Sequence, residues 1–374
     1  MTKCKLGDIC EIVSGSTPKT SIAEYWDGDV KWITPAELSD DTYIIMDSVR
    51  KITELAVEKT GLRSIPKGTV ILSSRAPIGK VAIAGCELYC NQGFKNLICS
   101  DVINNKYLYW FLKGNTAFLN SLGRGATFKE ISKSIVSEIE INIPSIMQQK
   151  KVVENLEKLN GIISIRKQEL QLLDQLVRGR FVELFGDPVS NTKGWKTEEM
   201  SKIAPVVNYK GKFNGEVWLL NLDMIEAQTG KILDYLIVSE DEVGNSTCTF
   251  DTNNVLYSKL RPYLNKVVIP DRCGYATSEL VPLQPVSKKM NREYLAFMLR
   301  SHEFVNMINE KVAGAKMPRV SMKEFRKFKV PVPPIELQNQ FADFVKQIDK
   351  SKFRGLSMLT MMKSAYDQQT FIYP

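Results

Sequence analysis

The sequence predicts an α+β fold made by tandem duplication, with two globular domains separated by two long helices that pair as an antiparallel, pseudo-twofold symmetric coiled coil. Two observations lead to this expectation. Blocks of the first half recur in the same order in the second half, and each copy ends in a proline corner followed by a long amphipathic segment. The predicted divisions are a first domain (head 1) over residues 1–145, a central helix over 146–186, a second domain (head 2) over 187–333 and a C-terminal helix over 334–374.

The repeat is clearest at the two proline corners, "IPSIMQQ" and "VPPIELQ". Pro333 follows Pro144 by 189 residues, and Gln338 follows Gln149 at the same distance. Upstream, "GATFKEIS" falls on "GAKMPRVS" at an offset of 189, "YLYWFL" on "YLAFML" at 187, and "WITPAEL" resembles "WLLNLDM" at 186. Because the offset drifts only slightly and the order never changes, we interpret the chain as a duplication.

Each copy has the same expected plan. A short amphipathic helix opens it, around Leu6–Val13 and around Thr197–Ile203. Short β-branched segments follow and predict strands, "VILSS", "KVAIA" and "NLICS" in the first copy and "VLYSKL", "KVVIP" and "LVPLQ" in the second. A helix carrying the Tyr-Leu pair, a glycine loop and a final strand then lead to the corner. Strands followed by helices within one copy favour an α+β domain.

After each corner the periodicity predicts a long helix with a coiled-coil seam. In the first copy, apolar residues recur with alternating spacings of four and three up to "GDP", where Gly186 is expected to end the helix. The seam positions are Val152, Leu156, Leu159, Ile163, Arg166, Leu170, Leu173, Val177, Arg180 and Leu184. The second stripe is less regular and consists of Phe341, Val345, Ile348, Leu356, Leu359, Met362 and Tyr366. Gly355 and Lys352 lie near it, which leaves the length of the second helix open.

Composition favours a reduced, cytoplasmic protein with a basic charge balance. The net charge is +8, which suits a nucleic-acid partner. The seven cysteines include no CxxC pair, and no apolar stretch is long enough to span a bilayer or act as an export signal. Cys86 and Cys90 lack a second cluster, so we expect no metal site.

The chain lacks recognisable catalytic chemistry. Its single histidine, His302, has no counterpart in the first copy, and no nucleophile–histidine arrangement can be assembled. Gly79-Lys80 lacks the remainder of a phosphate loop. In "PDRCGYATSEL" a leucine stands where a nuclease motif requires lysine. We therefore expect no catalytic residues and no cofactor. Two similar heads on a helical spacer would suit two half-sites on double-stranded DNA.

In its duplicated heads, its proline-glutamine corners, "LFGDP", and the "GAT…IS" and "GAK…RVS" loops, the chain resembles the specificity subunit (HsdS) of type I restriction-modification systems. The resemblance covers essentially the whole chain. It implies that each head is a target-recognition domain for half of a bipartite DNA target. It also implies that the helices set the spacing and dock two methyltransferase (HsdM) subunits. S-adenosylmethionine and ATP chemistry would belong to partners, and the presence of restriction/translocase (HsdR) subunits stays open.

The candidate DNA contacts are cations in turns and glycine loops, where they would reach phosphates or base edges. Two pairs recur in both copies, Arg75 with Arg261 and Lys80 with Lys266. The glycine loops add Arg124, Thr127 and Lys129 in head 1 and Lys316 and Arg319 in head 2, and "NYKGKFNG" adds Lys210 and Lys212. The recognised bases cannot be deduced from these residues.

Two other classes of function remain as alternatives to a DNA-specificity subunit. The first is a scaffold with two interaction domains on a coiled coil and no DNA contact. The second is a stand-alone DNA-modifying enzyme, which the missing motifs argue against. A split methylation motif with a fixed gap would favour the specificity subunit over the scaffold.

Overall fold

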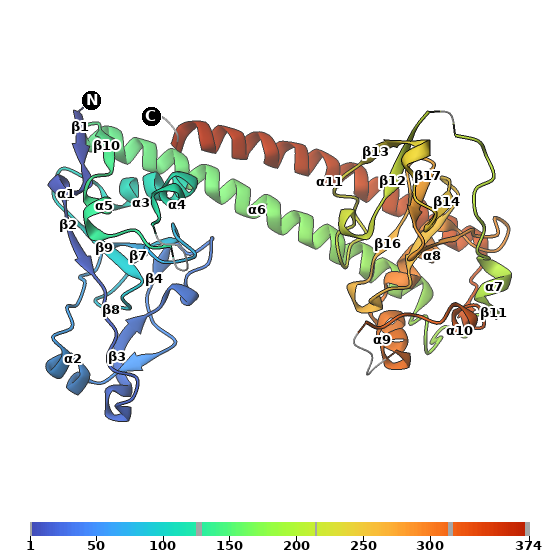
Figure 1. Cartoon of the computed structure of the whole chain (residues 1–374), viewed down its shortest axis with the longest axis horizontal. Helices are drawn as coiled ribbons and strands as arrows, with labels where there is room; N and C mark the ends of the chain where they lie inside the picture. The colour runs from blue at the N-terminus through green and yellow to red at the C-terminus, as the bar shows by residue number, and fades with distance from the viewer. Residues whose placement is uncertain (1, 125–128, 214, 313–316, 371–374) are drawn as a thin grey trace. The chain divides into compact units, whose positions relative to one another are not determined.

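A computed structural model describes residues 2–124, 129–213, 215–312 and 317–370, with residues 2 and 363–370 described by their backbone alone. The chain divides into two compact units. Unit 1 consists of Met1–Gln168 and Leu356–Pro374, and unit 2 consists of Glu169–Gly355. Each unit therefore contains one head together with part of each long helix (Figure 1).

The described part of unit 1 contains three sheets. A two-stranded antiparallel ribbon, β1–β10, joins the start of head 1 to its end, a five-stranded sheet has the order β2-β9-β6-β7-β4, and a three-stranded sheet has the order β5-β3-β8. The strands are β1 Thr2–Lys5, β2 Cys10–Ser14, β3 Trp26–Ile33, β4 Ile44–Ile45, β5 Lys51–Ile52, β6 Val70–Ser73, β7 Val81–Ala84, β8 Tyr89–Cys90, β9 Phe94–Cys99 and β10 Glu140–Ile143. The helices are α1 Leu6–Ile9, α2 Glu54–Thr60, α3 Asn105–Gly114, α4 Thr116–Leu122, α5 Lys133–Ser137 and α6 Ile146–Phe185, of which α6 continues into unit 2.

The core of head 1 lies between the five-stranded sheet and α3, and it includes the start of α6. The Asn104 side chain caps α3 by accepting hydrogen bonds from two backbone N–H groups. Leu108 and Leu112 on the inner face of α3 are fully buried. Val153 and Leu156, in the first turns of α6, belong to the same buried cluster. The long helix is thus built into the head rather than attached by a linker.

Unit 2 repeats this plan with different sheet sizes. A ribbon β11–β19 replaces β1–β10, a three-stranded sheet has the order β16-β15-β18, and a four-stranded sheet has the order β13-β12-β17-β14. The strands are β11 Thr197–Glu199, β12 Glu216–Leu220, β13 Leu236–Ser239, β14 Thr247–Phe250, β15 Val255–Ser258, β16 Val267–Val268, β17 Gly274–Thr277, β18 Leu280–Leu283 and β19 Lys329–Pro331. The helices are α7 Met200–Ile203, α8 Arg292–Arg300, α9 His302–Lys311, α10 Met322–Phe325 and α11 Ile335–Thr370.

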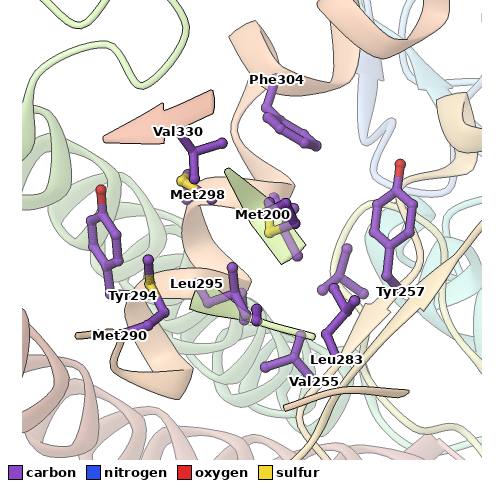
Figure 2. Packing of buried hydrophobic residues seen from close by; sticks show 14 of the residues in the cluster. Met200, Val255, Tyr257, Leu283, Met290, Tyr294, Leu295, Met298, Phe304 and Val330 are labelled. Carbon is purple, nitrogen blue, oxygen red and sulfur yellow. The ribbon is translucent and has the colours of Figure 1, made fainter. Parts of the chain in front are cut away.

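The core of head 2 packs α8 between strands and the long helices. Figure 2 shows Tyr294 and Leu295 of α8 among Met200, Val255 and other buried residues. Phe181 and Phe185 of α6 lie within aromatic contact distance of Tyr294, at 5.6 and 4.6 Å between ring centroids. Both copies therefore bury the face of the Tyr-Leu helix, and the predicted duplication is confirmed by the matching order of elements.

The predicted seam is confirmed on α6, where all ten positions are buried or partly buried. The helix ends at Phe185, and Gly186 adopts a positive φ of 72°, as expected for a glycine after a helix. Within unit 2, α11 runs antiparallel to α6. The ring centroids of Phe341 and Phe181 lie 5.4 Å apart, and Nζ of Lys352 lies 2.5 Å from Oδ1 of Asp174. From the first contact to the second, the residue number rises on α11 and falls on α6, as it does in an antiparallel pair.

The seam of α11 differs from the prediction at one described position. Leu356 is 46% exposed and does not belong to it. The four-three spacing passes instead through Lys352 and Gly355, because a regular heptad continues from Ile348 to these positions and then to buried Leu359. Tyr366 lies outside the residues whose side chains are described. The helix nevertheless continues to Thr370, which answers the question of its length.

The two opening helices are shorter than predicted. The first spans only Leu6–Ile9, and Cys10–Ser14 forms a strand paired with β9. The second spans Met200–Ile203, and Thr197–Glu199 pairs with β19. Strand pairing with distant segments overrides the local helical pattern at both places. Across the described parts of the chain, no helix is both long and apolar enough to cross a membrane.

Candidate nucleic-acid interface

The turns that carry Arg75 and Arg261 have the same hydrogen-bonded frame. The N–H of Ser73 donates to the carbonyl of Lys80 at 2.8 Å, and the N–H of Ser258 donates to the carbonyl of Lys266 at 3.0 Å. The second turn is one residue longer. Both arginine side chains are exposed at these turns.

The segment at the end of each glycine loop is hydrogen-bonded to the turn of its own head, and these bonds show which residues of the two turns correspond. The N–H of Ile131 donates to the carbonyl of Ser74, and the N–H of Val320 donates to the carbonyl of Lys259, both at 2.8 Å. One residue further along the turn, Arg75 bridges to Glu130 while Leu260 bridges to Arg319. The structural counterpart of Arg75 is therefore Leu260, and Arg261 lies one residue beyond it, because the longer turn shifts the alignment suggested by the sequence.

In head 1, Glu130 binds two cations. Nε of Arg75 lies 2.9 Å from one carboxylate oxygen, and Nζ of Lys95 lies 3.3 Å from the other. Lys95 comes from β9, and its side chain is only 7% exposed. Partial burial acts to raise the pKa of Glu130, but the hydrogen bonds and charges of Arg75 and Lys95 outweigh it and hold that pKa below its ordinary value.

Two further candidates flank the same glutamate. Arg124 exchanges backbone hydrogen bonds with Glu130, at 3.0 and 2.9 Å, and Lys129 precedes it in sequence. The side chains of Arg124 and Lys129 are exposed. Thr127 lies outside the described residues. The structure thus brings Arg75, which lies far away in the sequence, to the glycine loop that carries Arg124 and Lys129.

Head 2 holds the equivalent position with the opposite charge. Arg319 pairs with Glu279 at 2.8 Å, and Arg261 donates its backbone N–H to the carbonyl of Pro318, the residue before Arg319. Arg261 and Arg319 are therefore close neighbours on adjacent segments, and both are exposed. Lys316 lies outside the described residues.

Lys80 and Lys266 each bind a backbone carbonyl at the equivalent 3₁₀ turn of their own head. Nζ of Lys80 donates to the carbonyl of Leu38 at 2.5 Å, and Nζ of Lys266 donates to the carbonyl of Leu222 at 2.6 Å. Leu38 directly follows the 3₁₀ turn Pro35–Glu37 after β3, and Leu222 is the first residue of the 3₁₀ turn Leu222–Met224 after β12. Burial lowers the pKa of Lys266. Both ammonium groups thus point into their own head and hold a turn in place.

Lys210 and Lys212 lie on a different part of head 2. Their segment is attached to the four-stranded sheet through Tyr209, whose N–H donates to the carbonyl of Thr249 at 3.2 Å, and through Phe213, 4.8 Å from Tyr275. Both lysine side chains are exposed. Among the residues that the structure describes, no contact joins them to Arg261 or Arg319.

The sequence reasoning missed the acidic partners, Lys95 and two further cations. Glu130 and Arg319 occupy the same position in the repeat at the offset of 189, so their opposite charges could have been noticed. Trp32 and Trp218 are counterparts in the repeat. Cζ of Arg50 lies 5.8 Å from the ring centroid of Trp32, and Cζ of Arg272 lies 5.9 Å from that of Trp218. No sequence signal identifies these, because the two arginines come from unrelated positions.

The described residues contain no group of three or more histidine, cysteine, aspartate or glutamate side chains placed to hold a metal ion. Cys86, predicted to be structural, contacts the backbone carbonyl of Met46 through its sulfur at 3.2 Å. What the site offers chemically is a set of exposed guanidinium and ammonium donors on turns, two of them held by carboxylates. Such donors suit phosphate oxygens and the acceptor edges of bases.

Comparisons with known proteins agree with this chemistry. The family model described as "Type I restriction modification DNA specificity domain" matches residues 1–175 and 193–354. The chain is 28% identical to the type I restriction enzyme MjaIX specificity subunit of Methanocaldococcus jannaschii, over 97% of this chain and 90% of that protein. It is 24% identical to the type I restriction enzyme EcoDI specificity subunit of Escherichia coli, over 66% of this chain and 63% of that protein.

Two solved structures share the fold. The S subunit of a type I restriction-modification system from M. genitalium matches 99% of this chain and 94% of its own, with a TM-score of 0.53 and 17% identity. A chain from a structure of type I R-M complex assembly and conformational transition matches 99% of this chain and 96% of its own, with a TM-score of 0.64 and 14% identity. At these identities the likeness establishes the fold alone.

Proposed function

Because the chain belongs to the type I restriction-modification DNA specificity family, we propose that its two heads each read one half of a bipartite double-stranded DNA target. DNA target recognition within a restriction-modification complex is the function of this family. The observation that carries the proposal is the duplicated turn, in which exposed arginines are presented beside the end of a glycine loop in both heads.

The proposed DNA-contacting residues follow from exposure and from partners. Lys80 and Lys266 are set aside, because their ammonium groups donate to carbonyls of their own heads. The remaining candidates are exposed cations, or lie outside the described residues as Thr127 and Lys316 do. They are Arg75, Arg124, Thr127, Lys129, Lys210, Lys212, Arg261, Lys316 and Arg319.

The opposite charges of Glu130 and Arg319 support heads that read different bases. A carboxylate accepts hydrogen bonds from the amino groups of cytosine or adenine, whereas arginine donates to guanine. One position of the repeat therefore offers acceptors in head 1 and donors in head 2. Shared frames with different side chains would let both heads dock on DNA alike while selecting different sequences.

The long helices would set the distance between half-sites and dock two methyltransferase subunits. On α6 within unit 2, Leu172 and Leu176 are 54% and 50% exposed, and on α11 Phe353 is 75% exposed. Contiguous exposed apolar surface is typical of partner-binding sites, and Leu172 and Leu176 lie one turn apart on one face of α6. Catalysis would belong to these subunits and to nuclease subunits where present, leaving this chain non-catalytic and, like them, cytoplasmic.

The test is to express the chain with its methyltransferase partner and sequence the methylated bases of the host DNA. We expect a split motif with a fixed gap, and its loss when this chain is omitted. Methylation that is unchanged by the chain would instead favour the scaffold. Methyl transfer by a preparation free of partner subunits would contradict a non-catalytic role.

A further inference from the structure

Each long helix begins with a fully buried glutamine. Gln149 in the first turn of α6 and Gln338 in the first turn of α11 are both 0% exposed. A buried amide is unfavourable unless its hydrogen-bonding groups are satisfied. The contacts of these two side chains therefore show what each helix start is joined to.

In head 1, the Gln149 amide contacts three backbone groups. Its Oε1 accepts from the N–H of Asn104 at 2.7 Å, and its Nε2 donates to the carbonyls of Val102 and Pro144, each at 2.9 Å. Asn104 is the N-cap residue of α3, and Pro144 is the proline of the corner before α6. One side chain thus joins the start of α3, the chain leading into it and the corner.

In head 2, Gln338 makes the same three contacts. Its Oε1 accepts from the N–H of Asn291 at 2.8 Å, and its Nε2 donates to the carbonyls of Lys289 and Pro333, at 3.0 and 2.8 Å. Asn291 is the N-cap residue of α8. We call each set the glutamine brace, formed by Gln149 with Val102, Asn104 and Pro144, and by Gln338 with Lys289, Asn291 and Pro333.

A tyrosine reinforces each brace. The hydroxyl of Tyr107 on α3 donates to the carbonyl of Asn142 on β10 at 3.1 Å, and that of Tyr294 on α8 donates to the carbonyl of Pro331 on β19 at 3.3 Å. These strands lead directly into the proline corners. The helix of the head core is thereby tied both to the corner and to the strand before it.

These contacts constrain direction in a way that the surrounding apolar packing does not. Apolar contacts are non-directional, so they define the direction of a helix less sharply than hydrogen bonds do. Each amide instead uses both of its N–H donors and its oxygen on backbone groups with fixed geometry. A tilt of the helix start relative to the head would lengthen at least one of these buried hydrogen bonds.

We infer that Gln149 and Gln338 are positioning residues, which fix the direction in which each long helix leaves its head and so hold the gap between the half-sites to one length. This rests on the proposed reading of a bipartite target. The bases are read elsewhere in the heads, so the braces govern the strictness of the gap and leave the sequence of each half-site unchanged.

The experiment replaces each glutamine by leucine in the full chain, Gln149→Leu and Gln338→Leu separately, expressed with the methyltransferase partner. Methylated bases are then sequenced genome-wide. We expect both half-sites to keep their bases. The ratio of methylation at the native gap to that at gaps one base pair longer or shorter should fall by about tenfold, which corresponds to 1.4 kcal/mol.

The matched control is Gln148→Leu, the same chemical change at the exposed neighbour, whose amide oxygen accepts from the N–H and hydroxyl of Ser145. It should keep the native gap. If a leucine variant of Gln149 or Gln338 shows no cooperative unfolding transition, Tyr107→Phe and Tyr294→Phe decide, since each removes one hydroxyl. These should widen the gap distribution in the same direction by a smaller factor.

Three outcomes would overturn the inference. They are a strict gap in folded brace variants, altered bases in the half-site of the mutated head, and a strict gap in the tyrosine variants when the glutamine variants do not fold. A wild-type chain that yields no split motif would contradict the proposed function itself, which separates the two failures.

Discussion

Glu130 and Arg319 occupy the same position of the duplicated fold and carry opposite charges. Each directly precedes a residue whose backbone N–H donates to the turn, Ile131 after Glu130 and Val320 after Arg319. Glu130 binds Arg75 and Lys95, whereas Arg319 binds Glu279. The residue at the end of the glycine loop is therefore ion-paired in both heads with opposite charge, although its partners come from positions that are not equivalent in the repeat. A duplication that keeps the frame and changes the charge can separate docking from selectivity.

Removing Arg75 tests the role of the head 1 cations. Arg75→Ala should weaken DNA binding by the full complex across sequences and reduce the slope of log affinity against log salt by about one. The reason is the loss of one phosphate contact. Binding at several salt concentrations measures it, with Lys323→Ala as a control cation on α10. A relaxed single base with an unchanged slope would instead identify Arg75 as a base-reading residue.

The ion pairs of Glu130 should appear in the pH dependence of unfolding. Its folded pKa is depressed, so its contribution to stability is present above the unfolded glutamate pKa of about 4.3 and is lost as the pH falls through the lower folded value. Glu130→Gln should flatten the dependence of the unfolding free energy on pH in this acidic window. The slope of that dependence near neutral pH should stay unchanged. Urea unfolding at a series of pH values checks this, and an identical curve for the variant would contradict it.

Lys80 and Lys266 should behave as structural residues. Lys80→Met and Lys266→Met leave the carbonyls of Leu38 and Leu222 without these donors, which we expect to cost about 1–3 kcal/mol of unfolding free energy. The salt dependence of DNA binding should not change. A slope that falls by about one, with stability unaffected, would return these lysines to the set of phosphate contacts.

The glycines of the long helices should respond to alanine according to their surroundings. A Cβ at Gly179 meets nothing within 4 Å, so Gly179→Ala should stabilise the protein by about 1 kcal/mol through helix propensity. A Cβ at Gly355 would lie 3.3 Å from Cδ2 of Leu170, so Gly355→Ala should gain less and Gly355→Leu should destabilise the pairing. Thermal unfolding compares the three, and equal gains for both alanine variants would contradict a close seam at Gly355.

Much of the fold could be predicted because the repeat and the heptads are long-range patterns. The seam of α6 needed only spacing, and its ten positions are all buried or partly buried. The prediction that Leu356 lies in the seam was wrong, because it chose an apolar residue over Lys352 and Gly355, which the heptad spacing favours. The predicted length of the first opening helix was wrong, because Cys10–Ser14 pairs with a strand far along the chain. Local propensity does not indicate such a partner.

The site was harder to predict, because a sequence shows charges without their partners. Lys80 and Lys266 recur in the repeat because they hold the same turn, a constraint that resembles a shared DNA contact when only the letters are visible. Lys95 escaped notice because it lies within a strand. Recurrence in a duplication therefore indicates a shared constraint, and only the geometry separates a structural constraint from a binding one.

The most direct measurement of the central claim is a domain replacement followed by methylome sequencing. Residues 1–145 are exchanged for the same region of a related specificity subunit, and the hybrid is expressed with the same methyltransferase partner. Because each head has its own core and its own cations, the account predicts that one half-site changes while the other half-site stays intact. A hybrid in which both half-sites change, or in which neither does, would show that the two heads are not independent readers of DNA.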